Sequence, residues 1–425
     1  MSAPNPPLEL AAYEAGEVEV TKVASEGDTS SWNSGRLTID ADAIGTVAAA
    51  EPAIEAVRVE VVRPGDSVRI ANVLDVVEPA VRVENPAATF PGALGELSLA
   101  GRGRTNRLEG LGVVPVARLA GLADGEAADL PDSYIDMDGP GAARTRWSST
   151  ANVVLDFDVR GDAPVAEIDR SIRRAALRTA RDLAAATIGA EPASVETIPP
   201  PDGIAGAADL PSVAVILQVG SEGPLLDTYY YGHPLRGCSP IVVDPREVLD
   251  GALTNGAYDW AAARNPTAFY QRNTLVRELT AMNGERLRFA GVIVALGYLD
   301  SGFEKARSAM LSAQLAQRLG ADGVVCTTFE TGNSHTDTML TVRACERLGI
   351  RTTAILAETN GGLTDHVPEA DCLVSVGNEE ELVGAWTPVR VIGGADARVG
   401  RLVPGWAYLG AASQMGDMRW TAVPS

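Results

Sequence analysis

Hydrophobic positions change their spacing near residue 239. Before it, the segment 55–62 alternates apolar and charged residues with a period of two, which is typical of a half-buried strand. Further apolar segments follow at 68–77, 81–84 and 112–117, and glycine and proline turns separate them. Many short strands between such turns predict a β-rich N-terminal domain, either a barrel or a sandwich.

After residue 239, continuous apolar segments alternate with amphipathic ones. Strands are predicted at 287–298, 323–328, 351–357 and 372–376. Helices are predicted at 301–319, 334–348 and 379–383, and a glycine follows each of the first two. Buried strands that alternate with helices indicate a parallel sheet with right-handed crossovers, so we expect a Rossmann-like C-terminal domain.

Two further regions connect these patterns. Residues 164–186 carry apolar side chains at three- or four-residue spacing, which predicts a helix with one buried face, and 213–219 reads as a strand. The stretch 239–278 predicts a strand at 241–243, a helix from Pro245 that Thr254-Asn255-Gly256 ends, and a second helix at 268–282. The predicted organisation is a disordered tail at 1–7, a β-rich domain at 8–153, an α+β connecting region at 154–238 and a Rossmann-like α/β domain at 239–425.

Charge excludes two classes of partner. The 425 residues carry a formal net charge of -21, whereas nucleic acid and anionic membranes both require a basic surface. Lys22 and Lys305 are the only lysines, and neither lies in an apolar segment, so a lysine Schiff base is not expected.

The cysteines give no metal or redox pattern. They stand at positions 238, 326, 345 and 372, and these spacings suit neither zinc nor a Cys-x-x-Cys pair. The chain begins without the basic and apolar regions of a signal peptide, and no apolar segment is long enough to span a bilayer. We therefore expect a cytoplasmic protein with reduced cysteines and no metal.

Candidate chemistry gathers where the predicted strands end, because ligands bind at that edge of a doubly wound sheet. The loop after the strand at 323–328 holds four polar side chains and a turn glycine, namely Glu330, Asn333, His335, Asp337 and Gly332. Its helix start offers backbone amides to an anion; alternatively, Asn333 or Ser334 only caps the helix. Glu358 ends the next strand and is expected at the same edge.

Two other segments carry possible binding groups. Tyrosines occupy 229–231 and cannot all face one side of a strand, so we place Tyr231 on a pocket wall. The loop 101–104, Gly-Arg-Gly-Arg, is either a solvated turn, which we favour, or an anion-binding loop. Dinucleotide-binding, phosphate-loop and hydrolase nucleophile motifs are absent, so no cofactor is expected from the residues.

Several short motifs follow one another in a specific order. They include Asp75-Val-Val-Glu-Pro, Gly101-Arg-Gly-Arg-Thr, Asp227-Thr-Tyr-Tyr-Tyr-Gly, Asn265-Pro-Thr and Gly320-Ala-Asp-Gly-Val. Through them nearly the whole chain resembles the processed, pyruvoyl-forming subunit of component B of the glycine, sarcosine and betaine reductases, and more distantly the D-proline reductase proprotein.

The resemblance implies a reaction. In that family an internal cysteine becomes a pyruvoyl group, which captures the substrate amine as a Schiff base. A partner subunit that carries selenocysteine or cysteine then attacks the α-carbon, and the C–N bond is cleaved reductively. The resemblance therefore implies a hetero-oligomeric reductase for a small amine or amino-acid-like substrate, with substrate-binding residues at Asn255 and Gly256.

The chain departs from the family pattern at Tyr258, which occupies the catalytic position where the precursor cysteine is expected. Tyrosine cannot undergo the acyl shift and elimination that form a pyruvoyl group. The first hypothesis is therefore a component B-like reductase subunit without this group. The alternatives are a non-catalytic scaffold or ligand-binding subunit, and a repurposed enzyme for C–N or C–S bonds in specialised metabolism.

Overall fold

The computed structural model describes residues 13–19, 22–24, 30–33, 35–83, 90, 93–95, 97–119, 133–200, 209–258, 265–329, 332–358, 370–378, 381–394, 398–411, 413–415 and 421–423. They form a mixed α/β fold with several sheets and few helices, which confirms the predicted class. The predicted tail at 1–7 and Glu330 lie outside the described residues.

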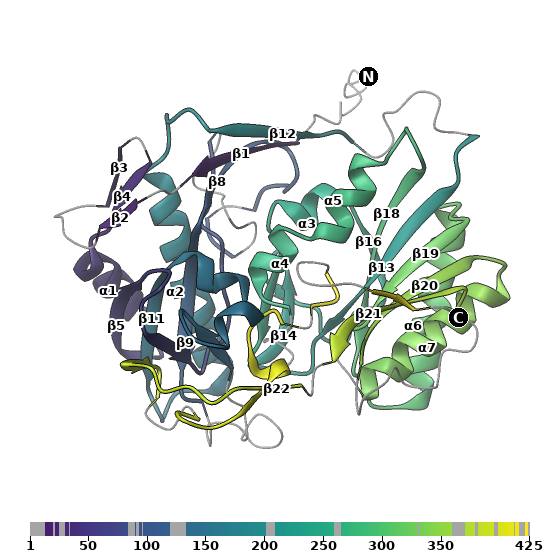
Figure 1. The fold of residues 1–425 in the computed structure, drawn as a ribbon. Coiled ribbons are helices and arrows are strands. Elements are labelled where there is room, and N and C mark those ends of the chain that lie inside the picture. Colours follow the sequence, from purple (N-terminus) through teal and green to yellow (C-terminus); the bar gives the residue numbers. More distant parts are fainter. Residues whose placement is uncertain are drawn as a thin grey trace.

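Small sheets make up the N-terminal half of the molecule (Figure 1). One sheet contains β12 (Ser194–Ile198), β1 (Tyr13–Glu19), β8 (Gly103–Glu109) and β7 (Ala80–Arg82). A second sheet contains β5 (Ile54–Val62), β11 (Ala151–Val159) and β9 (Leu111–Ala117). A third contains β10 (Tyr134–Asp136), β6 (Val68–Ala71) and β23 (Arg390–Ile392). A fourth contains β2 (Lys22–Ala24), β4 (Arg36–Thr38) and β3 (Ser31–Asn33). Because β23 pairs in parallel with β6, the segment around residue 390 returns to this half.

Two helices complete the core of the N-terminal half. Helix α2 (Val165–Ala185) follows Pro164 as predicted, and its predicted stripe is buried, namely Ile168, Ile172, Ala176, Thr179 and Leu183. Helix α1 (Ala41–Ala49) was not predicted from the hydrophobic spacing. The Asp40 side chain accepts a hydrogen bond from the Ala43 N–H and caps α1, so the capping residue was the available signal.

A seven-stranded sheet organises the C-terminal half. Its order is β16 (Ile241–Val243), β18 (Arg288–Gly297), β13 (Ser212–Gly220), β19 (Gly323–Thr327), β20 (Arg351–Glu358), β21 (Cys372–Asn378) and β25 (Thr421–Val423). The five inner strands are parallel, as predicted, and the two edge strands are antiparallel to their neighbours. The strand order reverses at β13, which has β18 on one side and β19 on the other. Such a reversal opens a crevice at the carboxyl ends of the strands.

Helices cover both faces of this sheet, which explains why its inner strands are apolar on both sides. Helices α6 (Gly302–Arg318) and α7 (Asn333–Arg347) cover one face, and α4 (Thr267–Gln271) and α5 (Thr274–Ala281) cover the other. Figure 1 places α3 (Pro245–Leu249), α4 and α5 between the sheet and the N-terminal half. The side chains of Ala214 and Ile216 face α6 and α7, whereas those of Val215 and Leu217 face the core that contains α5.

Leucine spacing in α6 predicts that residues 311, 315 and 319 form its buried stripe, and this prediction needs correction. These leucines are only half-buried, and the helix buries Ala309, Ala313 and Ala316 instead. Small side chains allow the helix to lie close to the sheet, and the leucines then cover the edges of the contact.

The central stretch holds further corrections. Helix α3 (Pro245–Leu249) ends at Leu249, and Gly251, two residues later, takes a positive φ of 86°. The segment predicted to end a helix, 254–256, instead lies in β17 (Leu253–Ala257), which pairs with β14 (Leu226–Tyr230). β14 also pairs with β15 (His233–Pro234). The strand partner of β17 lies far earlier in the chain, and tertiary pairing overrides the local turn signal.

Two predicted helices also differ. The helix predicted at 268–282 is two helices, α4 and α5, because Asn273 caps α5 through its side-chain oxygen and interrupts the continuity. In the segment 379–383, residues 382–383 form β22 (Leu382–Val383) paired with β24 (Val403–Pro404) instead of a helix. Residues 379–380 lie outside the described part.

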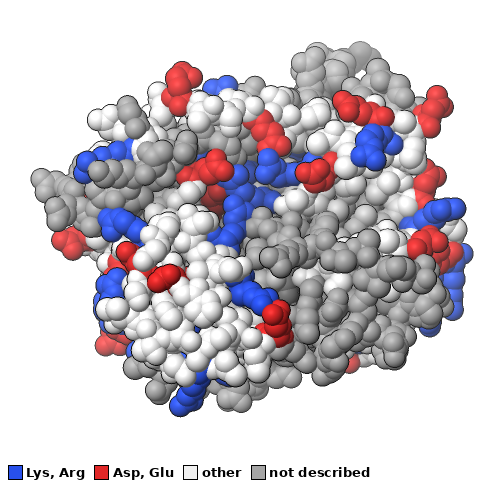
Figure 2. All heavy atoms as spheres, in the orientation of Figure 1, with Lys and Arg blue, Asp and Glu red and all other residues white. Residues whose placement is uncertain are grey.

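The described surface mixes both signs of charge. Figure 2 shows a band of Lys and Arg side chains across the middle of one face, with Asp and Glu side chains beside it. In the orientation of Figure 1 this band lies over the seam where β8 approaches α3 and α4.

Candidate functional site

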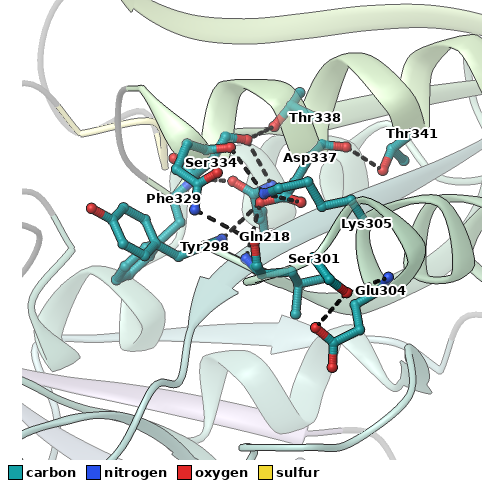
Figure 3. A network of polar contacts seen from close by, with 12 residues as sticks. Gln218, Tyr298, Ser301, Glu304, Lys305, Phe329, Ser334, Asp337, Thr338 and Thr341 are labelled. Atoms are coloured by element: carbon teal, nitrogen blue, oxygen red, sulfur yellow. Dashed lines mark hydrogen bonds and ion pairs between the residues drawn. The ribbon is translucent and has the colours of Figure 1, made fainter.

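A buried ion pair fixes the carboxyl edge of the parallel sheet (Figure 3). Asp337 on α7 accepts a hydrogen bond from the Lys305 ammonium of α6 at 2.9 Å, and both side chains are at most 10% exposed. The other carboxylate oxygen of Asp337 accepts the Tyr298 N–H at 2.8 Å and the Leu299 N–H at 3.4 Å. Burial raises the pKa of Asp337, although the bond from Lys305 opposes the shift. The pair therefore holds the turn that follows β18.

The backbone of that turn is strained. Tyr298 has a φ of 63°, a left-handed value that residues with a side chain rarely adopt. Such strain persists only where the surroundings impose it, and the two N–H bonds to Asp337 do so here. Asp337 thus holds this turn in place from behind the wall of the crevice.

A cavity of about 290 Å³ opens beside this turn, at the ends of β13 and β18. Its charged lining residues are Glu222, Arg236, Asp300, Glu304 and Arg307. The thiol of Cys238, which is exposed, also lies on its wall. Two guanidinium groups and three carboxylates around one cavity suit a small ligand that carries an anionic and a cationic group.

A second set of bonds joins the crevice to the central stretch. The Gln218 amide at the end of β13 accepts the Phe329 N–H at 2.6 Å and donates to the Ser334 carbonyl at 3.1 Å. Asn265 donates to the Phe329 carbonyl at 3.0 Å. The loop before α7 and the segment that carries the Asn-Pro-Thr motif therefore meet at Phe329.

The Asn-Pro-Thr motif in turn contacts the Asp75 motif of the N-terminal half. Asp75 accepts the Thr267 N–H at 2.7 Å and its hydroxyl at 2.6 Å, and the same hydroxyl accepts the Asn255 N–H at 2.8 Å. Asp75 is buried, and burial raises its pKa to about 7 despite these hydrogen bonds. Two motifs that are distant in sequence thus form one buried junction next to β17.

The residues predicted at the reaction centre lie inside this junction. Tyr258 is 3% exposed, packs in the hydrophobic core of the N-terminal half, and donates its N–H to the Leu225 carbonyl at 2.6 Å. Burial raises the pKa of its phenol well above the usual value. Gly256 pairs with Asp227 in the sheet, and a Cβ there would lie 2.6 Å from the Tyr229 ring. Asn255 and Gly256 thus lie within β17, where they pair with Thr228 and Asp227.

Tyr231 and the glycine–arginine loop belong to another buried network. The Tyr231 hydroxyl donates to Glu247 at 2.7 Å and accepts the Ala100 N–H at 3.0 Å. Asp250 accepts the Gly101 N–H at 2.7 Å and pairs with Arg82. The loop at 101–104 therefore does bind an anion through Gly101, but the anion is a carboxylate of the same chain.

The structure separates the remaining predicted residues. Gly332 precedes α7 with a φ of 62°, and Asn333 begins the helix with an exposed side chain. His335 is 2% exposed and does not line the cavity. Glu358 ends β20, and the structure describes its backbone but not its side chain. Asp337, Asn333 and Gly332 thus lie near the crevice at the carboxyl edge of the sheet, whereas Tyr231 and Tyr258 lie elsewhere.

Sequence reasoning missed Lys305 and the cavity arginines. Lys305 is buried, contrary to its expected surroundings, on the same face of α6 as Ala309, Ser312 and Ala316. A lysine in an otherwise small and apolar stripe was the signal that predicted a buried partner. Arg236 and Arg307 gave no comparable signal, because the turn at 236–238 and α6 meet only in the folded chain.

Comparison with known proteins gives the class. The family model described as "Glycine/sarcosine/betaine reductase component B subunits" matches residues 12–415. This chain belongs to that family. No solved structure matches the chain.

Individual relatives agree with the family match. The "Glycine reductase complex component B subunits alpha and beta" of Acetoanaerobium sticklandii are 32% identical over 83% of this chain and 82% of their own. The "Sarcosine reductase complex component B subunit alpha" of Peptoclostridium acidaminophilum is 32% identical with the same coverage. The "Betaine reductase complex component B subunit alpha" of the same organism is 31% identical over 90% of this chain and 88% of its own.

The stretch where the resemblance places the family's reaction centre lacks the residue types from which a pyruvoyl group is made. Such a group is made from a serine or cysteine, and the chain has neither between Pro240 and Tyr270. Tyr258 is a buried residue of the hydrophobic core. Among the described residues, no group of His, Cys, Asp and Glu side chains is arranged to hold a metal ion, and no helix is long and apolar enough to cross a membrane.

Proposed function

We propose that this chain is a component B-like subunit of an amino-acid reductase complex that works without a pyruvoyl group of its own. It acts on a small amino-containing substrate, whose C–N bond is cleaved reductively with a thiol- or selenol-bearing partner subunit, in a cytoplasmic hetero-oligomer. The observation that carries the proposal is the family match over residues 12–415 combined with a buried tyrosine at position 258.

The substrate binds in the cavity at the ends of β13 and β18, at the carboxyl edge of what we interpret as a Rossmann-like sheet. A substrate carboxylate pairs with Arg236 and Arg307, and its amino group lies toward the carboxylates of Glu222 and Glu304. These charged residues are exposed, so an external thiolate has access to the bound α-carbon. The role of this chain is to bind and orient the substrate rather than to supply an electrophile.

The Asp337–Lys305 pair keeps the wall of this cavity in place. Tyr298 and Leu299 line the cavity, and Asp337 fixes both of their N–H groups. Loss of this carboxylate would let the strained turn relax and change the shape of the cavity. We assign to Asp337 a positioning role.

Reconstitution tests the proposal. The purified chain, a thiol- or selenol-bearing partner subunit, a dithiol and candidate amines are combined, and release of the amine is measured. Arg307→Gln should raise KM for a carboxylate-bearing substrate roughly tenfold, since a charge-assisted bond contributes about 1.5 kcal/mol. Arg318→Gln, an exposed arginine at the other end of α6, is the matched control and should leave KM unchanged. No turnover and no complex with any amine would overturn the proposal.

Measurement of the intact mass tests separately whether a pyruvoyl group forms in this chain. The chain should remain one species of 44.3 kDa that does not react with a hydrazine. Two fragments, one of them hydrazine-reactive, would show that a pyruvoyl group forms and that this part of the proposal is wrong.

The buried Tyr258 also favours a second function, that of a non-catalytic scaffold or ligand-binding subunit. In that case the complex would need the chain for assembly, but turnover would be insensitive to Arg236→Gln and Arg307→Gln. Equal turnover for these variants and for the unmodified chain, with activity lost when the chain is omitted, would select the scaffold.

A further inference from the structure

A second, smaller cavity lies at the seam between the two halves of the molecule. It measures about 30 Å³, room for roughly two waters or one small anion. Four segments line it: the β6–β7 connection with Glu78, the β8–β9 turn with Gly110, a short helix with Arg146 and Trp147, and α4 with Ala268, which Arg272 follows. None of these segments contributes to the cavity proposed for the substrate.

The indole N–H of Trp147 needs an acceptor. Trp147 is 3% exposed and packs edge-to-face on Phe269, with ring centroids 5.0 Å apart. Its Nε1 atom is buried and has no hydrogen-bond partner among the described residues. An indole nitrogen only donates, so the partner must be a group that accepts. A buried donor without an acceptor is costly, which points to a ligand in the adjoining cavity.

The charge of the lining favours an anion over water. Two guanidinium groups, those of Arg146 and Arg272, line the cavity together with a single carboxylate, that of Glu78. Arg272 donates its Nε–H to both oxygens of Glu78, at 2.6 and 2.7 Å. Although burial opposes it, the charges of Arg272, Arg107 and Arg146 lower the pKa of Glu78. The positive field at this carboxylate is thus larger than one ion pair supplies.

We propose that this cavity binds a small monovalent anion, held by the Trp147 indole N–H and the guanidinium groups of Arg146 and Arg272. The anion ties α4 to the N-terminal half, because Arg272 directly follows α4 whereas Trp147 and Glu78 belong to the other side. Thr267, the first residue of α4, bonds to Asp75 and Asn255. Anion binding therefore stabilises the buried junction that holds β17, independently of the function proposed above.

Thermal unfolding of the full chain tests this site. Sodium gluconate, whose anion is too large for the cavity, is replaced stepwise at constant ionic strength by sodium chloride or by sodium formate. The melting temperature should rise and saturate with chloride if the site takes inorganic anions, and with formate if it takes carboxylates. If the melting temperature stays at its gluconate value with both chloride and formate, the proposal is overturned and the cavity is a water site.

Variants connect the effect to this cavity. Trp147→Phe keeps the ring and removes the N–H, so the midpoint of the anion titration should move to roughly tenfold higher concentration. Trp32→Phe, in β3 of the distant small sheet, is the matched control and should leave the midpoint unchanged. An unchanged midpoint for Trp147→Phe would refute the assignment.

Diffraction from the unmodified chain avoids any dependence on variants. Crystals grown in sodium bromide should show an anomalous peak between Arg146 and Arg272. The absence of a peak there, with bromide ordered elsewhere on the surface, would reject a halide site, and a negative formate titration as well would reject the anion site altogether.

Discussion

Substitution of Asp337 by asparagine tests the buried ion pair most directly. The change leaves the Lys305 ammonium buried without a carboxylate, and the Asn333 carbonyl, its other acceptor among the described residues, lies 3.4 Å away. Breaking a buried pair by removing one partner costs about 3–5 kcal/mol. Because this pair lies near the crevice, we expect the lower end, about 3 kcal/mol of unfolding free energy. The single side-chain oxygen of asparagine can face either Lys305 or the N–H groups of Tyr298 and Leu299, so one side of the contact loses its acceptor.

The opposite substitution should cost less. Lys305→Met removes the ammonium, but the carboxylate of Asp337 keeps the N–H bonds from Tyr298 and Leu299. We expect about 1–2 kcal/mol for this variant, because the charge that remains is still hydrogen-bonded. The double variant Asp337→Asn with Lys305→Met should be less destabilised than the sum of the two, since no uncompensated charge is left.

Urea unfolding of all four proteins, followed by tryptophan fluorescence, gives the free energies from midpoint and slope. The asymmetry between the two single variants is the decisive quantity. If Lys305→Met costs as much as Asp337→Asn, or if both cost less than about 1 kcal/mol, the reasoning that places the essential charge on Asp337 is wrong.

Three further outcomes are expected. The Asp75 pKa is raised to about 7, so this carboxyl holds its proton better in the folded chain than in the unfolded chain. The stability that it contributes at low pH is therefore lost as pH rises from about 4 to 7. Asp75→Asn should remove about 4 kcal/mol of this pH dependence in unfolding experiments. Gly256→Ala places a Cβ 2.6 Å from the Tyr229 ring and should cost about 2 kcal/mol or more in urea, whereas Gly302→Ala, with nothing near its Cβ, should be close to neutral. Asp250→Ala leaves Arg82 and the Gly101 N–H without their carboxylate and should lower stability by about 3 kcal/mol in the same assay; a loss below about 1 kcal/mol would contradict a buried role.

Much of the parallel sheet could be predicted because its information is local. The strands from β18 to β21 are apolar on both sides, and glycines end the intervening helices, so each element is specified within its own segment. The segment 254–256 was misread because its strand partner, β14, lies some distance away in the sequence. Local turn residues cannot reveal a pairing that only the folded chain makes.

The candidate site also combines features that the local sequence predicts with features that only the folded chain shows. The position of Asp337 at the sheet edge followed from the strand and helix pattern, but its partner Lys305 comes from another helix. The favoured interpretation of the loop at 101–104 was a solvated turn, and nothing local indicated that Asp250 would accept the Gly101 N–H. Sequence patterns thus identified groups capable of binding, whereas the identity of what they bind depended on long-range packing.

The pairing of β23 with β6 has a consequence for synthesis in the cell. Val68 and its neighbours in β6 find their strand partner only when Arg390–Ile392 has been made. A ribosome releases the chain from its N-terminus, so one edge of β6 stays exposed until nearly the whole protein has emerged. An open strand edge is a template for association with other chains. Truncated translation products should therefore be prone to aggregate, and a nascent chain of this protein is a natural client for chaperones.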